Sequence, residues 1–213
     1  MSKKFMVMVI LSVLFFLAMP AGSAMAGFSF GFSANKGGVN NFYVAVSDYN
    51  RVPQNEVVAI RNRGIPDEEL PVVYYLAAKA NVRPNVIVDM RLRHMAWMDI
   101  AFKFHLSPDV FYVPVKTAVH GGPYEGYYKH YNVKKNRWNK IRLTDEEVVN
   151  SVNLRFASEH YGYSPEEVIK MRSNGKNFVA IHEDLRAAKN NNAGHGHEGH
   201  EEGKSRDHRD YNH

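Results

Sequence analysis

The chain has no cysteine among its 213 residues. Without thiols it has no disulfide bonds, no thiolate zinc site, no c-type haem attachment and no cysteine nucleophile. The stability of the fold must therefore come from apolar packing, for which the chain carries two Trp, twelve Tyr and twelve Phe.

Long apolar runs are scarce, and only residues 5–19 form one. This run follows two lysines and precedes the small-residue sequence PAGSAMA, which is the order of a secretory signal peptide. Ala24 and Ala26 predict cleavage before Gly27. An uncleaved anchor is the alternative, but a run of this length reaches roughly 22 Å, less than the roughly 30 Å hydrocarbon core. We therefore expect a periplasmic or secreted protein without a transmembrane helix after cleavage.

Recognisable catalytic motifs are also missing. The chain has no G-x-S-x-G, no P-loop and no dinucleotide-binding fingerprint. Loss of the signal peptide lowers the net charge from +5 to +3, a surplus more typical of solubility than of a specific anionic partner. We predict no catalytic residues; an enzyme centred on His120 or His130 is the alternative.

The most informative feature is an internal repeat, in which residues 65–106 match residues 143–185 in pattern. A partial third copy, residues 54–64, repeats the V-x-x-I-R core. The paired positions are Asp67 with Asp145, Glu68 with Glu146, Glu69 with Glu147, Pro84 with Pro165, Met90 with Met171, Arg91 with Arg172, Trp97 with Phe178 and Ile100 with Ile181.

Each full copy is predicted to form three helices. In the second copy, Thr144 with Glu147 forms a capping box, and Ser164 with Pro165 begins the next helix in preferred positions. Apolar residues then recur at helical spacing as far as residue 188. The predicted fold class is mainly α, with two related three-helix units, a short β element and a disordered C-terminal tail.

The β element is predicted from residues 42–46 and 110–115, which are rich in β-branched and aromatic residues. The two segments are expected to pair as a small sheet. Pro114 would confine the second segment to an edge.

The predicted organisation has five parts. They are a signal peptide (1–26), an N-terminal segment with the partial repeat and first helical unit (27–114), a connector rich in Tyr, Gly and basic residues (115–142), a second helical unit (143–188) and a His-rich tail (189–213). The candidate partner-binding residues are Arg61, Arg91, His120, Tyr124, Tyr127, Tyr128, His130 and Arg172.

The tail carries the clearest chemical signal, because imidazole nitrogens and carboxylate oxygens alternate along a glycine-rich segment. Zn, Ni or Cu would suit such ligands, although no cofactor is required by the sequence. A solvated tail with incidental metal affinity is the alternative. The predicted metal ligands are His195, His197, His200, His208 and His213.

Residues 164–185 also resemble the helix-turn-helix of DNA-binding domains. Export argues against nucleic acid as the partner. Arg61, Arg91 and Arg172 lie at equivalent positions and could contact phosphate groups. A structural role explains them equally well, in which the aliphatic part of each side chain covers the edge of the core and the guanidinium stays in water.

The motif P-x-x-V-I-x-M-R, with Ile and Val in reverse order in the first copy, occurs twice with an aromatic-x-x-I stripe. The two copies flank a connector that ends in W-x-x-I-x-L (Trp138, Ile141, Leu143). This combination resembles a group of uncharacterised exported bacterial proteins over residues 42–185. The resemblance implies no activity and no functional residues. We expect a non-catalytic binding or interaction protein whose partner is a protein or an envelope component; the alternative is divalent-metal binding or buffering through the tail.

Overall fold

A computed structural model describes residues 36–194, and these residues are mainly helical with no β-strand among them. No helix in this range is long and apolar enough to cross a membrane. The predicted signal peptide and the predicted metal ligands lie outside the described residues.

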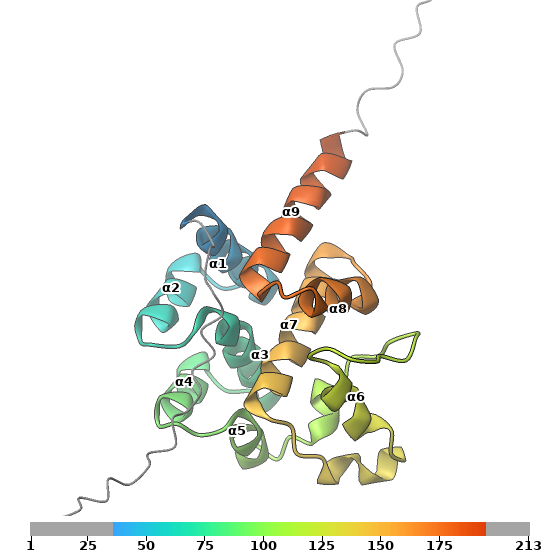
Figure 1. Cartoon of the computed structure of the whole chain (residues 1–213). Coiled ribbons are helices and arrows are strands. Elements are labelled where there is room, and N and C mark those ends of the chain that lie inside the picture. The colour runs from blue at the N-terminus through green and yellow to red at the C-terminus, as the bar shows by residue number, and fades with distance from the viewer. Residues whose placement is uncertain (1–35, 195–213) are drawn as a thin grey trace, which may run out of the picture. The chain divides into compact units, whose positions relative to one another are not determined.

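Twelve helical elements follow one another along the described part of the chain (Figure 1). They are α1 (Lys36–Asn50), α2 (Gln54–Asn62), η1 (Asp67–Glu69), α3 (Leu70–Ala80), α4 (Pro84–Leu92), α5 (Trp97–Lys103), η2 (Pro108–Phe111), α6 (Glu125–Tyr131), η3 (Lys135–Lys140), α7 (Asp145–Tyr161), α8 (Pro165–Ser173) and α9 (Phe178–Gly194), where η marks a 3₁₀ helix.

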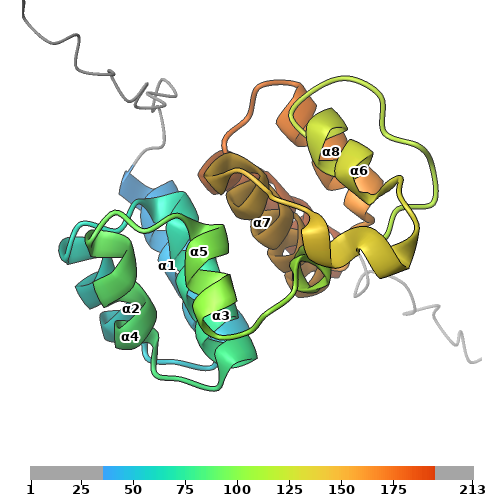
Figure 2. The ribbon, with the colours of Figure 1, turned by 90° about the horizontal axis from the view of Figure 1, so that it is seen from below.

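Helices α1, α3, α7 and α9 surround the apolar core, because α7 contacts the other three and α1 also contacts α3 and α9. Helices α2 and α4 lie on one side of this group, and α6 and α8 lie on the other (Figure 2). Phe42 of α1, Phe156 of α7 and Phe178 of α9 are almost completely buried in the core. The predicted mainly helical class is therefore confirmed.

The predicted strand at residues 42–46 is wrong, because this segment is part of α1. Phe42, Val46 and Tyr49 recur at helical spacing and turn toward α7 and α9, where Phe42 and Tyr49 contact Phe156. β-branched and aromatic residues favour strands only weakly, and here burial of the apolar face of α1 stabilises the helix instead.

The predicted strand at residues 110–115 is also wrong. Pro108 begins the 3₁₀ helix η2, and the extended residues after it have no neighbouring strand in the described part of the chain. Side chains bond to their backbone instead. Tyr127 Oη donates to Phe111 O at 2.8 Å and accepts from Val113 N–H at 2.8 Å, while Tyr128 Oη donates to Val113 O at 3.0 Å.

Both predicted helix starts in the second unit are confirmed. Thr144 and Ser164 accept hydrogen bonds from the backbone N–H of Glu147 and Glu167, and each glutamate bonds back to the residue that caps it. The last helix extends further than predicted, since α9 continues past residue 188 to Gly194. Lys189 Nζ donates to His160 O at 3.3 Å and so ties this extension to α7.

Two helix starts are capped by acidic residues from distant parts of the chain. Trp97 N–H at the start of α5 donates to Asp145 Oδ1 at 2.7 Å. Phe178 N–H at the start of α9 donates to Glu68 Oε1, also at 2.7 Å. A carboxylate at a helix N-terminus stabilises the exposed amide groups and the helix dipole. Asp145 and Glu68 therefore join the first half of the fold to the second.

Candidate functional site

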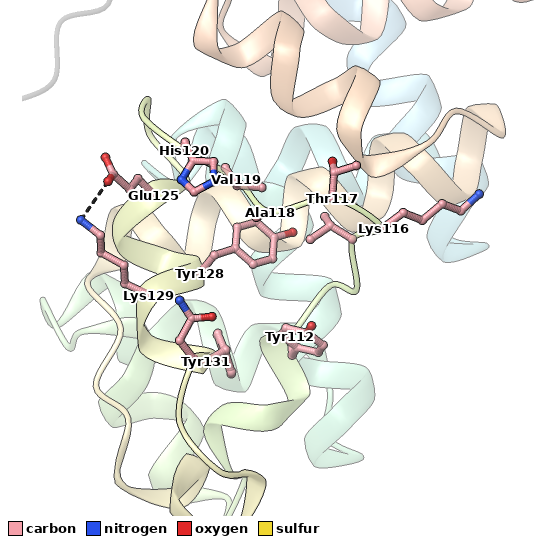
Figure 3. A pocket seen from close by; sticks show the side chains of 12 residues that line it. Tyr112, Lys116, Thr117, Ala118, Val119, His120, Glu125, Tyr128, Lys129 and Tyr131 are labelled. Carbon is pink, nitrogen blue, oxygen red and sulfur yellow. Dashed lines mark ion pairs between the residues drawn. The ribbon is translucent and has the colours of Figure 1, made fainter.

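A cavity of about 320 Å³ lies between α6 and the segment that precedes it (Figure 3). Residues 115–120 form a loop, here called the strap, along one side, and α6 forms the other side. The ring of Tyr128 lies at the centre of the view, and the amine of Lys116 points away from the cavity. The volume is at the lower end of the range for small-molecule sites.

Aromatic rings form much of the cavity wall. Tyr112, Tyr128 and Tyr131 line it, and the ring centroid of Tyr112 lies 4.9 Å from that of Tyr131 and 6.5 Å from that of Tyr128. The hydroxyls of Tyr128 and Tyr131 donate to the backbone carbonyls of Val113 and Pro108. These bonds and burial raise the rigidity of the wall, and burial raises the pKa of both hydroxyls above the ordinary tyrosine value.

The strap and the glycine turn that follows it lie close to α8. Near its start, Lys116 N–H donates to the carboxylate of Glu166, and bonds from the backbone of Lys116 and Thr117 lower the pKa of that carboxyl. Beyond the strap's end, Gly122 has a φ of +68°, and a Cβ at this position would lie 2.8 Å from Ser173 Oγ. One wall of the cavity is therefore bonded to a separate helix, α8.

Charged groups surround the cavity mouth. Glu125 and Lys129 lie one turn apart on α6 and form an ion pair at 2.9 Å, which lowers the pKa of the Glu125 carboxyl. His120 lies beside Glu125 on the strap (Figure 3). Thr117, His120 and Asn132 are exposed and line the cavity, so they offer a hydroxyl, an imidazole and an amide to a bound molecule.

The structure brings together only part of the predicted partner-binding residues. His120 and Tyr128 line the cavity. Tyr124 and Tyr127 are buried, and Tyr124 Oη donates to Asn150 O at 3.1 Å. His130 turns toward α7, where its Nε2 lies 3.2 Å from Glu147 Oε1.

The three predicted arginines lie elsewhere and bind within the fold. Arg61 forms an ion pair with Asp67. Arg91 binds the carboxylate of Glu69 in a bidentate manner, with hydrogen bonds of 2.8 Å from Nε and 2.7 Å from Nη2. Arg91 also bonds Asp145 at 2.6 Å. Arg172 is buried beside Phe178 and donates to Lys176 O at 3.0 Å. Their contacts join helices rather than line the cavity.

Sequence reasoning missed Tyr112, Thr117 and Asn132 as cavity residues. Tyr112 had been included in a predicted strand, and Thr117 and Asn132 lie in the connector without a recognisable motif. The Gly121–Gly122 pair was the available signal, since two consecutive glycines before a helix indicate a tight loop that can enclose a site.

No group of three or more His, Asp or Glu side chains within residues 36–194 is placed to hold a metal ion. Comparisons of the chain with protein-family models, with curated proteins and with solved structures found no match.

Proposed function

We propose that the protein is an exported, non-catalytic binding protein that holds a small ligand in the cavity beneath the strap. The observation that carries the proposal is the preformed cavity itself, whose aromatic wall is fixed by tyrosine hydroxyl bonds to the backbone. A preformed site binds without the entropic cost of ordering its own walls.

The lining defines the kind of ligand. Tyr112, Tyr128 and Tyr131 favour a flat or apolar body, and Thr117, His120 and Asn132 favour groups that donate and accept hydrogen bonds. A cavity of about 320 Å³ has space for a ligand of one or two rings. We therefore propose a small cyclic envelope metabolite as ligand class.

Blocking the cavity tests the proposal. Ala118 is exposed on the strap and lines the cavity, so Ala118→Trp adds bulk there without replacing a buried residue. Ala59→Trp is the matched control, because Ala59 is exposed on α2. Each protein is incubated with the dialysable fraction of a cell-envelope extract, and retained molecules are identified by native mass spectrometry.

We expect the wild type and Ala59→Trp to retain the same small molecule and Ala118→Trp to lose it. Retention of that molecule by Ala118→Trp would contradict the proposal, as would the absence of any retained molecule on the wild type. An N-terminus at Gly27 on protein recovered from the producing cells tests the proposed export.

Divalent-metal binding through the His-rich tail is the alternative function and rests on the sequence alone. The five histidines of the tail follow Gly194, the last residue of α9, and none of them lines the cavity. A protein that acts through the tail loses its role when the tail is deleted, whereas one that acts through the cavity does not.

We also infer that α3–α4–α5 and α7–α8–α9 are related units. Arg91 and Arg172 support this inference, because each donates to the carbonyl four residues later and lies over the aromatic residue that starts the third helix. The distances from guanidinium to ring are 4.7 Å at Trp97 and 5.1 Å at Phe178.

A further inference from the structure

Residues 126–144 contain six Lys and Arg residues and no acidic residue. The 3₁₀ helix η3 lies in the middle of this stretch, in the yellow segment between α6 and α7 of Figure 1. Such a concentration of one charge is costly unless it is solvated or meets an anionic partner. The arrangement of the side chains on η3 distinguishes between these roles.

A 3₁₀ helix places residues three apart in a row, because it has three residues per turn. Arg137 N–H donates to Lys134 O at 2.8 Å, which closes the first turn. Lys134, Arg137 and Lys140 therefore follow one another along one side, about 6 Å apart. All three are exposed, and none has an ion-pair partner among the described residues. These three residues are here called the cationic row.

The other side of η3 fixes the row in place. Trp138 lies against Tyr112 and Tyr131, with ring centroids 4.7 and 4.8 Å apart, and donates its indole N–H to Val133 O at 3.0 Å. Ile141 is buried one turn further along. Because Trp138 packs against Tyr112 and Tyr131, η3 is fixed in place and the cationic row faces solvent.

We propose that the cationic row binds the phosphate groups of an anionic lipid surface. Several Lys and Arg side chains on one exposed face are attracted to acidic headgroups, each adding to the affinity. Val133 is 42% exposed just before the row and supplies an apolar tip for the interface. Single-stranded nucleic acid fits less well, because its bases need exposed aromatic rings on which to stack, whereas the ring of Trp138 packs against Tyr112 and Tyr131.

The test uses the full chain and measures co-sedimentation with vesicles of phosphatidylcholine alone or mixed with phosphatidylglycerol. The difference between the two vesicle types is the readout, which removes any contribution from apolar segments. The test variant is K134Q/R137Q/K140Q. The matched control is R51Q/R83Q/R93Q, which removes the same charge from three exposed arginines on other loops.

We expect the control to bind the mixed vesicles as the wild type does and the row variant to bind roughly 100-fold more weakly. High salt should release the wild type, since screening weakens the attraction. Equal loss in both variants would assign the binding to net charge and overturn the proposal. Release by inorganic phosphate beyond that by chloride of equal ionic strength would assign the row to free phosphate, and tighter binding to a single-stranded oligonucleotide would assign it to nucleic acid; either result overturns the proposal.

This inference does not depend on the proposed cavity ligand. Ala118→Trp should leave vesicle binding unchanged, and the row variant should still retain the molecule held in the cavity. Loss of both properties in the row variant, with its circular dichroism unchanged, would overturn the assignment of separate sites.

Discussion

Acid should destabilise this protein through His182, a histidine of α9 that is only 1% exposed. Its ring lies 4.2 Å from that of Phe156 and 5.0 Å from that of Phe42, between centroids. Neither ring nitrogen has a hydrogen-bond partner within residues 36–194. Burial lowers the pKa of His182 from 6.5 to about 3, and nearby His160 acts in the same direction.

The sign of the effect follows from proton binding. Below pH 6.5 the unfolded chain binds a proton at His182, whereas the folded chain stays neutral there until about pH 3. The free energy of unfolding therefore falls as the pH falls through this window, by about 1.4 kcal/mol for each pH unit. At pH 4.5 the loss from this one group reaches about 3 kcal/mol, a large part of the stability of an ordinary domain.

The assay is urea unfolding followed by circular dichroism at pH 7 and pH 4.5, at constant ionic strength. His182→Phe keeps an aromatic ring in the core and removes the titrating nitrogens; His182→Leu is the second version if the larger ring is not accommodated. The pH-dependent change in unfolding free energy should be about 3 kcal/mol smaller in the variant than in the wild type. His105→Asn, at an exposed position, is the control.

An equal loss of stability between pH 7 and pH 4.5 in the wild type and in both His182 variants would show that His182 is not the source of this pH dependence. The lower limit of pH 4.5 separates the titration of His182 from that of the acidic side chains. Glu183, for example, has a pKa lowered by Arg186 and Asn41, so its stabilising contribution is lost only as the pH falls below 4.5.

Three further predictions concern the strap, the arginines and the tail. Gly121→Ala should cost about 1 kcal/mol in urea unfolding, because Gly121 has a positive φ and a Cβ there meets no other atom. Gly122→Ala should cost about 2 kcal/mol, because Gly122 also has a positive φ and a Cβ there would meet the side chain of Ser173. Arg91→Met should lower the free energy of unfolding by about 3 kcal/mol, as it leaves two carboxylates unpaired, whereas Arg63→Met removes an exposed pair and should cost less than about 1 kcal/mol. A chain ending at Gly194 keeps α9 whole and should bind less zinc or nickel than the full chain by calorimetry; equal binding would exclude the tail as the ligand source.

The sequence predicts correctly those features whose physical cause is local. Thr144 and Ser164 cap their helices through a glutamate three residues later, and both partners of each cap are visible in the sequence. The failure at residues 42–46 has the opposite cause. The segment suits a strand by composition, and only the contact of Phe42 and Tyr49 with Phe156, more than 100 residues away, makes the helix the better solution.

Composition and short-range pattern are sufficient to predict the absence of thiol chemistry, the mainly helical class and the acid-free basic stretch, because none of these depends on contacts between distant residues. The roles of two tyrosines and two acidic residues depend instead on contacts in the tertiary structure. Tyr127 and Tyr128 form hydrogen bonds with the backbone of Val113, which a neighbouring strand would otherwise provide. Asp145 caps a helix that starts 48 residues before it, and Glu68 caps a helix that starts 110 residues after it. The cavity likewise depends on a contact between distant residues, because Glu166 of α8 binds the strap at Lys116, 50 residues earlier, and no local pattern encodes that contact.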